Sequence, residues 1–309
     1  MNMYYFIINP ASGSGKGLAI WKTVQSELDR LHVDYSHFLL RGPGEGTALA
    51  RSLSASHRPC TLVAVGGDGT INEIINGLGS FENITFACIP TGSGNDFVRG
   101  LGLTRDPLDA LHRILSPSKY LHINIGQLQI NGEPSPRNFA VSSGAGFDAA
   151  VCYSVDSSAL KTALNRFHSG KLVYLLTSLW LLFTMERLTL SISIDDGEPA
   201  VYEKSYFTAA MNLQYEGGGF RFCPDASPDD DMLDLIVVNG ISRFHALCLL
   251  PLSLFGKHIG HSGIHVFRCR KAAIKSTDRL CFHTDGEIRG FSGSALFSLC
   301  EKKLAVILR

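Results

Sequence analysis

The sequence has no excess of charge of either sign. Its 28 basic residues balance 28 acidic residues, and charged residues make up only 18% of the 309 positions. A nucleic-acid-binding surface usually brings a surplus of Lys and Arg, so we expect no nucleic-acid partner. The sequence also lacks an uninterrupted apolar run of about 20 residues, the length that spans a bilayer.

Two further absences bear on the compartment. The eight cysteines form no C-x-x-C pair, and several lie inside apolar runs as small core residues do. Their scatter indicates a reducing environment. The first residues lack the basic start of a signal peptide. Together these features predict a cytoplasmic protein, and the 45% of hydrophobic residues suffices for one large or two medium cores.

The apolar pattern changes at about residue 122. Before it, strand-like and helix-like segments alternate, which predicts a parallel sheet covered by helices on both faces. After it, strand-like segments separated by Gly, Pro and Asp predict an antiparallel sheet or sandwich. The expected strands are 4–8, 35–40, 61–65, 85–89, 123–130, 188–194, 206–211, 233–238, 279–283 and 304–308, and the expected helices begin with 17–31, 47–54 and 107–115.

Two glycine-rich turns follow buried strands, and each carries an Asp. The first is Gly66-Gly67-Asp68-Gly69-Thr70, and the second is Gly92-Ser93-Gly94-Asn95-Asp96-Phe97. A strand that turns through glycines into a helix presents backbone N–H groups and the positive end of the helix dipole, which favour a phosphate. Either turn alone is equally compatible with an ordinary tight turn. The pair predicts a site for a polyphosphate and its metal.

These two stretches resemble the diacylglycerol kinase catalytic-domain family, especially its soluble bacterial lipid kinases. The segments 8–13, 138–148, 217–220 and Thr284-Asp285-Gly286-Glu287 also resemble family motifs, in the expected order. The resemblance implies a Rossmann-like α/β nucleotide domain over 1–122 and an antiparallel β-sandwich lipid domain over 123–301, with a cleft between them. It also implies that a final strand, about 302–309, returns to the first domain.

The resemblance implies an ATP- and Mg²⁺-dependent kinase that phosphorylates a lipid hydroxyl, with diacylglycerol as the first expectation. Asp68 and Asp96 would organise the metal. Glu287 is the expected base, with Asp285 orienting it or taking its place, although Asp285-Gly286-Glu287 alone would read as a hairpin turn. The expected nucleotide contacts are Asn9, Gly66, Gly67, Asp68, Gly69, Thr70, Glu73, Ser93 and Asn95.

A second metal is expected in the acidic segment 223–234, which offers hard oxygen ligands for Mg²⁺ or Ca²⁺. By resemblance, its ligands would be Asp230 and the carbonyl groups of Ser227 and Met232. A solvated acidic turn is the alternative. The sequence departs from the family pattern at Leu40 and Asn124, where weaker nucleotide or metal binding is expected.

Two apolar helices are expected over 170–185 and 243–256. They either cap the core of the second domain or offer one side to acyl chains. With Lys161, Arg166 and Lys171 near anionic headgroups, the second interpretation predicts transient contact with the inner face of the membrane and a lipid substrate there. A homodimer is left open. The alternatives to a lipid kinase are a NAD kinase and a catalytically silent lipid or nucleotide sensor.

Overall fold

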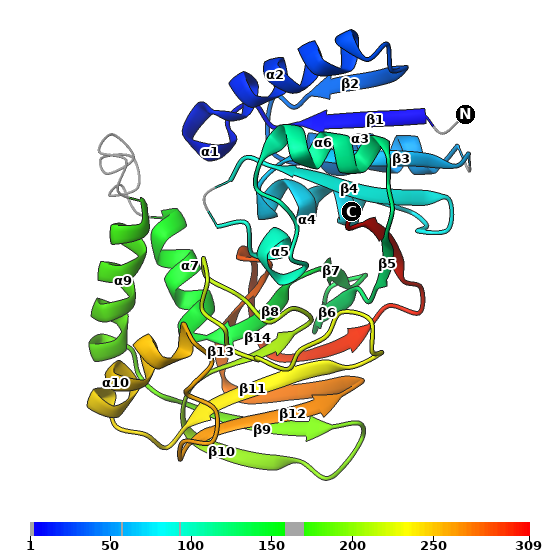
Figure 1. Cartoon of the computed structure of the whole chain (residues 1–309). Coiled ribbons are helices and arrows are strands. Elements are labelled where there is room, and N and C mark those ends of the chain that lie inside the picture. The colour runs from blue at the N-terminus through cyan, green and yellow to red at the C-terminus, as the bar shows by residue number, and fades with distance from the viewer. Residues whose placement is uncertain (1–2, 57, 93, 158–169) are drawn as a thin grey trace.

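The computed structural model of the chain describes residues 3–56, 58–92, 94–157 and 170–309. Two units lie one against the other: a mostly parallel sheet with helices, and an antiparallel β-rich unit (Figure 1). This arrangement confirms the predicted fold class.

The first sheet has six strands in the order β2-β1-β3-β4-β15-β5. All neighbours run parallel except β15 and β5. The C-terminal strand therefore lies between two strands that precede the β-rich unit in sequence. The strands are β1 (Met3–Ile8), β2 (Tyr35–Leu39), β3 (Cys60–Gly66), β4 (Ile84–Pro90), β5 (Tyr120–Ile123) and β15 (Leu304–Ile307).

Helices cover both faces of this sheet, and every residue of its central strand β3 is buried. In β3, Leu62 and Ala64 pack toward Ile74 of one helical layer, whereas Val63 and Val65 join a core on the opposite face. This is the period-2 alternation of a strand buried on both sides. The helices are α1 (Ser12–Gly15), α2 (Gly17–Arg30), α3 (Glu45–Ser54), α4 (Asp68–Gly77), α5 (Asp96–Gly100) and α6 (Pro107–Leu115).

The second unit is a nine-stranded antiparallel sheet. Strand β9 pairs with both β10 and β13, so the sheet closes on itself around a second apolar core. The strands are β6 (Gly126–Ile130), β7 (Arg137–Phe139), β8 (Ser142–Gly146), β9 (Leu188–Ile194), β10 (Ala200–Met211), β11 (Leu233–Asn239), β12 (Ile264–Cys269), β13 (Lys271–Thr284) and β14 (Glu287–Leu299).

One strand predicted from the sequence forms parts of two strands in the structure. The segment 123–130 is broken after Ile123, where the chain leaves the first sheet and enters the second. At the crossing, the Asn124 N–H donates to the carbonyl of Pro228 (2.5 Å) and the carbonyl of Ile125 accepts the N–H of Cys300 (2.8 Å). Sequence alternation continues through these residues although their hydrogen bonds change sheets.

Three helices flank one end of the β-rich unit: α7 (Phe147–Ser157), α9 (Gly170–Thr184) and α10 (Arg243–Ser253) (Figure 1). The last two confirm the predicted apolar helices. Within the described residues, no helix is both long and apolar enough to cross a membrane.

Candidate active site

The carboxyl ends of β1, β3 and β4 meet at one edge of the first sheet, as they must in parallel neighbours. There Asn9 donates from Nδ2 to Thr70 Oγ1 (3.1 Å), which joins the end of β1 to the start of α4. The hydroxyl groups of Ser12 and Thr91 lie 2.5 Å apart, and Thr91 N–H donates to the Gly66 carbonyl (2.9 Å). The structure thus brings Asn9, Thr70 and both glycine-rich turns together.

The glycines of these turns are required by the packing of the turns themselves. A Cβ on Gly66 would lie 2.5 Å from the Thr70 side chain, and one on Gly92 would lie 2.8 Å from Gly67 Cα. Real Cβ atoms do not approach so closely, so a side chain at Gly66 would distort the first turn, and one at Gly92 would push the two turns apart. The closeness of the turns is therefore encoded in the glycines.

Asp68 is the first residue of α4, and its carboxylate ties the first turn to the second. It accepts the N–H groups of Asp96 and Phe97 (3.1 Å each) and so caps the short helix α5. Burial raises the pKa of Asp68, and these two N–H groups oppose the rise. An alanine here would remove a helix cap as well as a charge, so asparagine is the sharper test substitution.

Asp96 lies beside Asp68 in a buried position. One oxygen pairs with Arg99 (2.8 Å) and the other accepts Gly218 N–H (2.7 Å). Burial and the charge of Asp68 raise the pKa of Asp96 to about 6. Two neighbouring carboxylates that are costly to ionise in a buried site fit a divalent cation, whose charge would offset both.

Two other predicted nucleotide contacts are engaged with the backbone. Glu73 accepts the N–H groups of Gly44 and Gly46 (3.0 and 3.1 Å), and so holds the loop before α3. Asn95 donates to the Gly92 carbonyl (2.7 Å) and adopts φ 53°, a left-handed conformation that asparagine tolerates. Their contact with nucleotide stays a prediction. Ser93, Lys161 and Arg166 lie outside the described residues.

Asp285 and Glu287 approach this edge from the β-rich unit. Asp285 accepts three backbone N–H groups, from Ala140, Val141 and Ser142, at 2.8–3.1 Å. Its fourth donor is Asn72 Nδ2 on α4, at 2.8 Å. Four donors occupy its two oxygens and fix the carboxylate in place, which suits an orienting role.

Glu287, in contrast, is exposed at the start of β14. A Cβ on Gly69 would lie 2.8 Å from Glu287 Oε1, so this carboxylate touches the first glycine-rich turn. The structure therefore brings Glu287 from one unit against the loop of Asp68 from the other.

The structure contains a buried cluster that the sequence did not predict, formed by Asp148, Glu216 and His283. His283 Nε2 lies 3.0 Å from Asp148 Oδ2 and 3.1 Å from Glu216 Oε1. Asp148 ends one of the family-like motifs, and Glu216 and His283 directly precede two others. The spacing of 135 residues between Asp148 and His283 gave no sign that they meet.

The acidic turn forms a compact loop before β11. Met232 N–H donates to Asp230 Oδ1 (3.0 Å), and Ser227 Oγ donates to Asp229 (2.7 Å). The other Asp230 oxygen pairs with Arg268 on β12. A cation at this turn would therefore compete with Arg268 for Asp230, and the metal ligands Ser227, Asp230 and Met232 stay a prediction.

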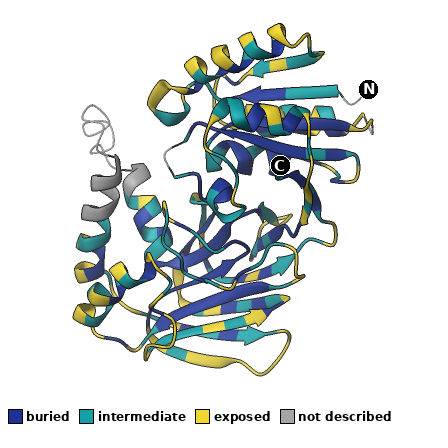
Figure 2. Cartoon of the chain, viewed as in Figure 1, coloured by how far each residue is buried: buried dark blue, intermediate teal, exposed yellow. Residues whose placement is uncertain are grey.

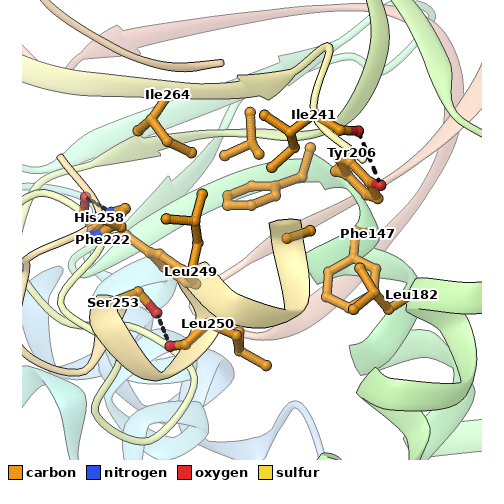
Figure 3. A pocket seen from close by; sticks show the side chains of 13 residues that line it. Phe147, Leu182, Tyr206, Phe222, Ile241, Leu249, Leu250, Ser253, His258 and Ile264 are labelled. Atoms are coloured by element: carbon orange, nitrogen blue, oxygen red, sulfur yellow. Dashed lines mark hydrogen bonds between the residues drawn. The ribbon is translucent and has the colours of Figure 1, made fainter. Parts of the chain in front are cut away.

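The helices α9 and α10 line an apolar pocket of about 60 Å³ against β10 and β11 (Figure 3). Phe147, Leu182, Phe222 and Leu249 are among its walls. Exposed positions lie along both helices (Figure 2). Among them are Trp180 on α9 and Phe244 on α10, with 61% and 73% of their surfaces accessible.

Known protein families match both units. Residues 3–127 match the diacylglycerol kinase catalytic domain, and residues 141–307 match the YegS C-terminal NAD kinase beta sandwich-like domain. The chain is 30% identical over 295 residues to the "Putative lipid kinase YtlR" of Bacillus subtilis, covering 94% of each chain. The chain belongs to the diacylglycerol kinase family. A diacylglycerol kinase of the same organism is 28% identical and covers 92% of this chain and 89% of its own.

Membership of this family makes the chain a kinase and confirms the resemblance seen in its motifs. Among solved structures, "a putative diacylglycerol kinase" from Bacillus anthracis superposes with a TM-score of 0.77 at 22% identity, covering 100% of this chain and 97% of the other. A NAD kinase from Archaeoglobus fulgidus superposes with a TM-score of 0.56 at 13% identity, covering 99% and 93%. Likeness at that level concerns the fold alone.

Proposed function

We propose that this kinase transfers the γ-phosphoryl group of ATP to the hydroxyl group of a lipid, with diacylglycerol as the first acceptor and phosphatidate as the product. The observation that carries the proposal is the contact between Glu287 and Gly69. It sets a carboxylate of the β-rich unit against the turn that begins α4, where backbone N–H groups would receive phosphate oxygens.

In this proposal each residue has one task. Glu287 accepts the proton of the acceptor hydroxyl, and Asp285, held by four donors, fixes the turn from which Glu287 extends. Asn9 and Thr70 orient the first turn toward the nucleotide. Asp68 and Asp96 would hold Mg²⁺. The bound ion would supply charge neutralisation at the transferring phosphoryl group.

The acceptor is proposed to be reached at a membrane surface. Phe244 on α10 and Phe255 just beyond it are 73% and 70% exposed, and Trp180 on the neighbouring α9 is 61% exposed. Leu249 of α10 and Leu181 of α9 are buried. Each helix thus packs one side on the core and leaves aromatic residues on the other, as an interfacial element does.

The acceptor class is tested by incubating the purified protein with γ-labelled ATP, Mg²⁺ and separate acceptors in mixed micelles. The acceptors are diacylglycerol, monoacylglycerol, sphingosine and, in solution, NAD. We expect labelled phosphatidate in a Mg²⁺-dependent reaction, and Asp68→Asn should remove most of it. Labelled NADP as the sole product, or no labelled lipid from any acceptor, would reject the proposal.

A further inference from the structure

His283 lies at the end of β13 with none of its surface exposed. Its Nε2 atom faces two carboxylates, Asp148 at 3.0 Å and Glu216 at 3.1 Å. Glu216 is itself only 9% exposed, and among the described residues its second oxygen has no hydrogen-bond partner. Buried carboxylates are costly unless they are paired, so Glu216 depends on His283 for its place.

The other ring nitrogen faces the turn that carries the proposed base. Gly286 N–H donates to His283 Nδ1 at 3.2 Å. Gly286 has φ 83°, a conformation that only glycine adopts easily, and it lies between Asp285 and Glu287. The ring therefore fixes the peptide between Asp285 and Gly286, one residue before Glu287.

The carboxylate side of the ring leads to the metal side of the site. Glu216 begins a tight loop that closes back on Phe220, with Glu216 N–H donating to the Phe220 carbonyl at 2.9 Å. From this loop Gly218 N–H donates to Asp96 at 2.7 Å. One imidazole thus contacts both the loop that binds Asp96 and the turn that carries Glu287.

We propose that His283 is a positioning residue that sets the distance between the two halves of the active site. Nε2–H holds Glu216 and, through its loop, the Gly218 contact to Asp96, whereas Nδ1 holds Gly286 and thereby Glu287. The proposal rests on the function proposed above and deepens it, because it explains how a base and a metal-organising carboxylate from different loops keep register.

Two other roles for the His283 ring compete with positioning: that of a buried cation and that of a metal ligand. Burial lowers the pKa of His283, but the charges and hydrogen bonds of Asp148 and Glu216 outweigh it and raise the pKa to about 10. A pKa of about 10 would place a second proton on Nδ1 at neutral pH, but the Gly286 N–H points at the lone pair that this proton would occupy. This contact assigns the ring a proton on Nε2 and none on Nδ1. It also disfavours a metal at Nε2, since a metal-bound imidazole normally carries a proton on its other nitrogen.

Two substitutions divide the functions of the ring. Glutamine at 283 places an N–H near the position of Nε2, and asparagine places an acceptor near Nδ1. We expect His283→Gln to lower kcat by about 10- to 100-fold, the usual cost of losing such a support, with the KM for ATP nearly unchanged. His283→Asn should keep more turnover and need more Mg²⁺ for half-maximal rate. The matched control is His265→Gln, which should behave as wild type. His265 lies on strand β12, and its ring pairs with Asn239 of β11 at 3.0 Å.

A double-mutant cycle separates positioning from general loss of structure. If His283 acts through Glu287, His283→Gln should cost less than about twofold in a Glu287→Gln background, because coupled residues are not additive. Full additivity of the two losses, or a His283→Gln variant as active as wild type, would overturn the proposal.

Nuclear magnetic resonance on the wild type tests the geometry without any variant. With ¹⁵N-labelled His and Gly, Nδ1 of His283 should resonate as an unprotonated nitrogen with a scalar coupling to the Gly286 amide across the hydrogen bond. A protonated Nδ1, or a metal bound in equimolar amount and released by Asp148→Asn, would contradict it. Failure of the wild type to phosphorylate any lipid rejects the proposed function instead, so the two failures are distinguishable.

Discussion

Asp96 shows how a carboxylate that is proposed to hold a metal can oppose stability. Burial and the neighbouring Asp68 raise its pKa to about 6, from an ordinary value of 3.8. Because the folded state then holds the proton more tightly than the unfolded state, ionisation of Asp96 lowers the free energy of unfolding as the pH rises through this interval. Ionised Asp96 therefore lowers the stability of the metal-free protein above pH 6, and this loss of stability is absent below pH 4.

Asp96→Asn should remove this loss of stability. In EDTA, we expect the free energy of unfolding of the variant to rise relative to that of wild type as the pH increases from 4 to 7. The change should be about 3 kcal/mol at most, since one pKa unit corresponds to about 1.4 kcal/mol. Denaturant unfolding of both proteins at several pH values measures the difference. A difference that stays constant, or that shrinks as the pH rises, would contradict the cause assigned to this pKa.

Among elements, α9 and α10 show what periodicity in the sequence can and cannot reveal. Their apolar composition predicted two helices, and the structure has them at Gly170–Thr184 and Arg243–Ser253. Which side is buried was not predictable, because nearly every position of α10 is apolar and the choice depends on the strands beneath. The segment 123–130 was predicted as one strand because the alternation of apolar and polar residues does not show where a chain passes from one sheet to another.

The aromatic side of these helices should govern attachment to lipid. Phe244→Ser with Phe255→Ser removes two side chains that are 73% and 70% exposed, so the fold should be little affected. We expect sedimentation with anionic vesicles to weaken by tenfold or more, on the order of 1.4 kcal/mol of lost apolar transfer. Leu39→Ser, on β2 of the other unit and 45% exposed, is the control. Equal vesicle binding by both variants would assign these aromatics no role in attachment.

At the scale of the whole molecule, the two units meet through α4. Asn72 is 1% exposed; it donates to Asp285 (2.8 Å) and accepts from Arg289 (3.0 Å). Asn76, one turn later, exchanges hydrogen bonds with the backbone of Asn138. The glycine-rich turns could be predicted from sequence because their chemistry is local. These contacts could not, because Asn72 and Asp285 are 213 positions apart and neither forms part of a periodic pattern.

Asn72→Ala should loosen the contact between the units. Loss of the amide leaves Asp285 one donor short and Arg289 without this acceptor, at a cost of about 1–3 kcal/mol. We expect a lower midpoint in denaturant and faster amide exchange in both α4 and β7, whereas the exposed Lys22→Ala on α2 should change neither. Unchanged stability, or faster exchange confined to α4, would show that this contact does not couple the units.

The central claim is that Glu287 takes the proton of a lipid hydroxyl beside the first glycine-rich turn. The most direct test is Glu287→Gln, with lipid turnover and ATP affinity measured on the same preparation across a Mg²⁺ titration. General base catalysis contributes about 10²–10⁴-fold, so turnover should fall within that range while ATP affinity stays within about twofold and added Mg²⁺ restores nothing. Turnover that matches wild type, or that returns with Mg²⁺, would contradict the assignment.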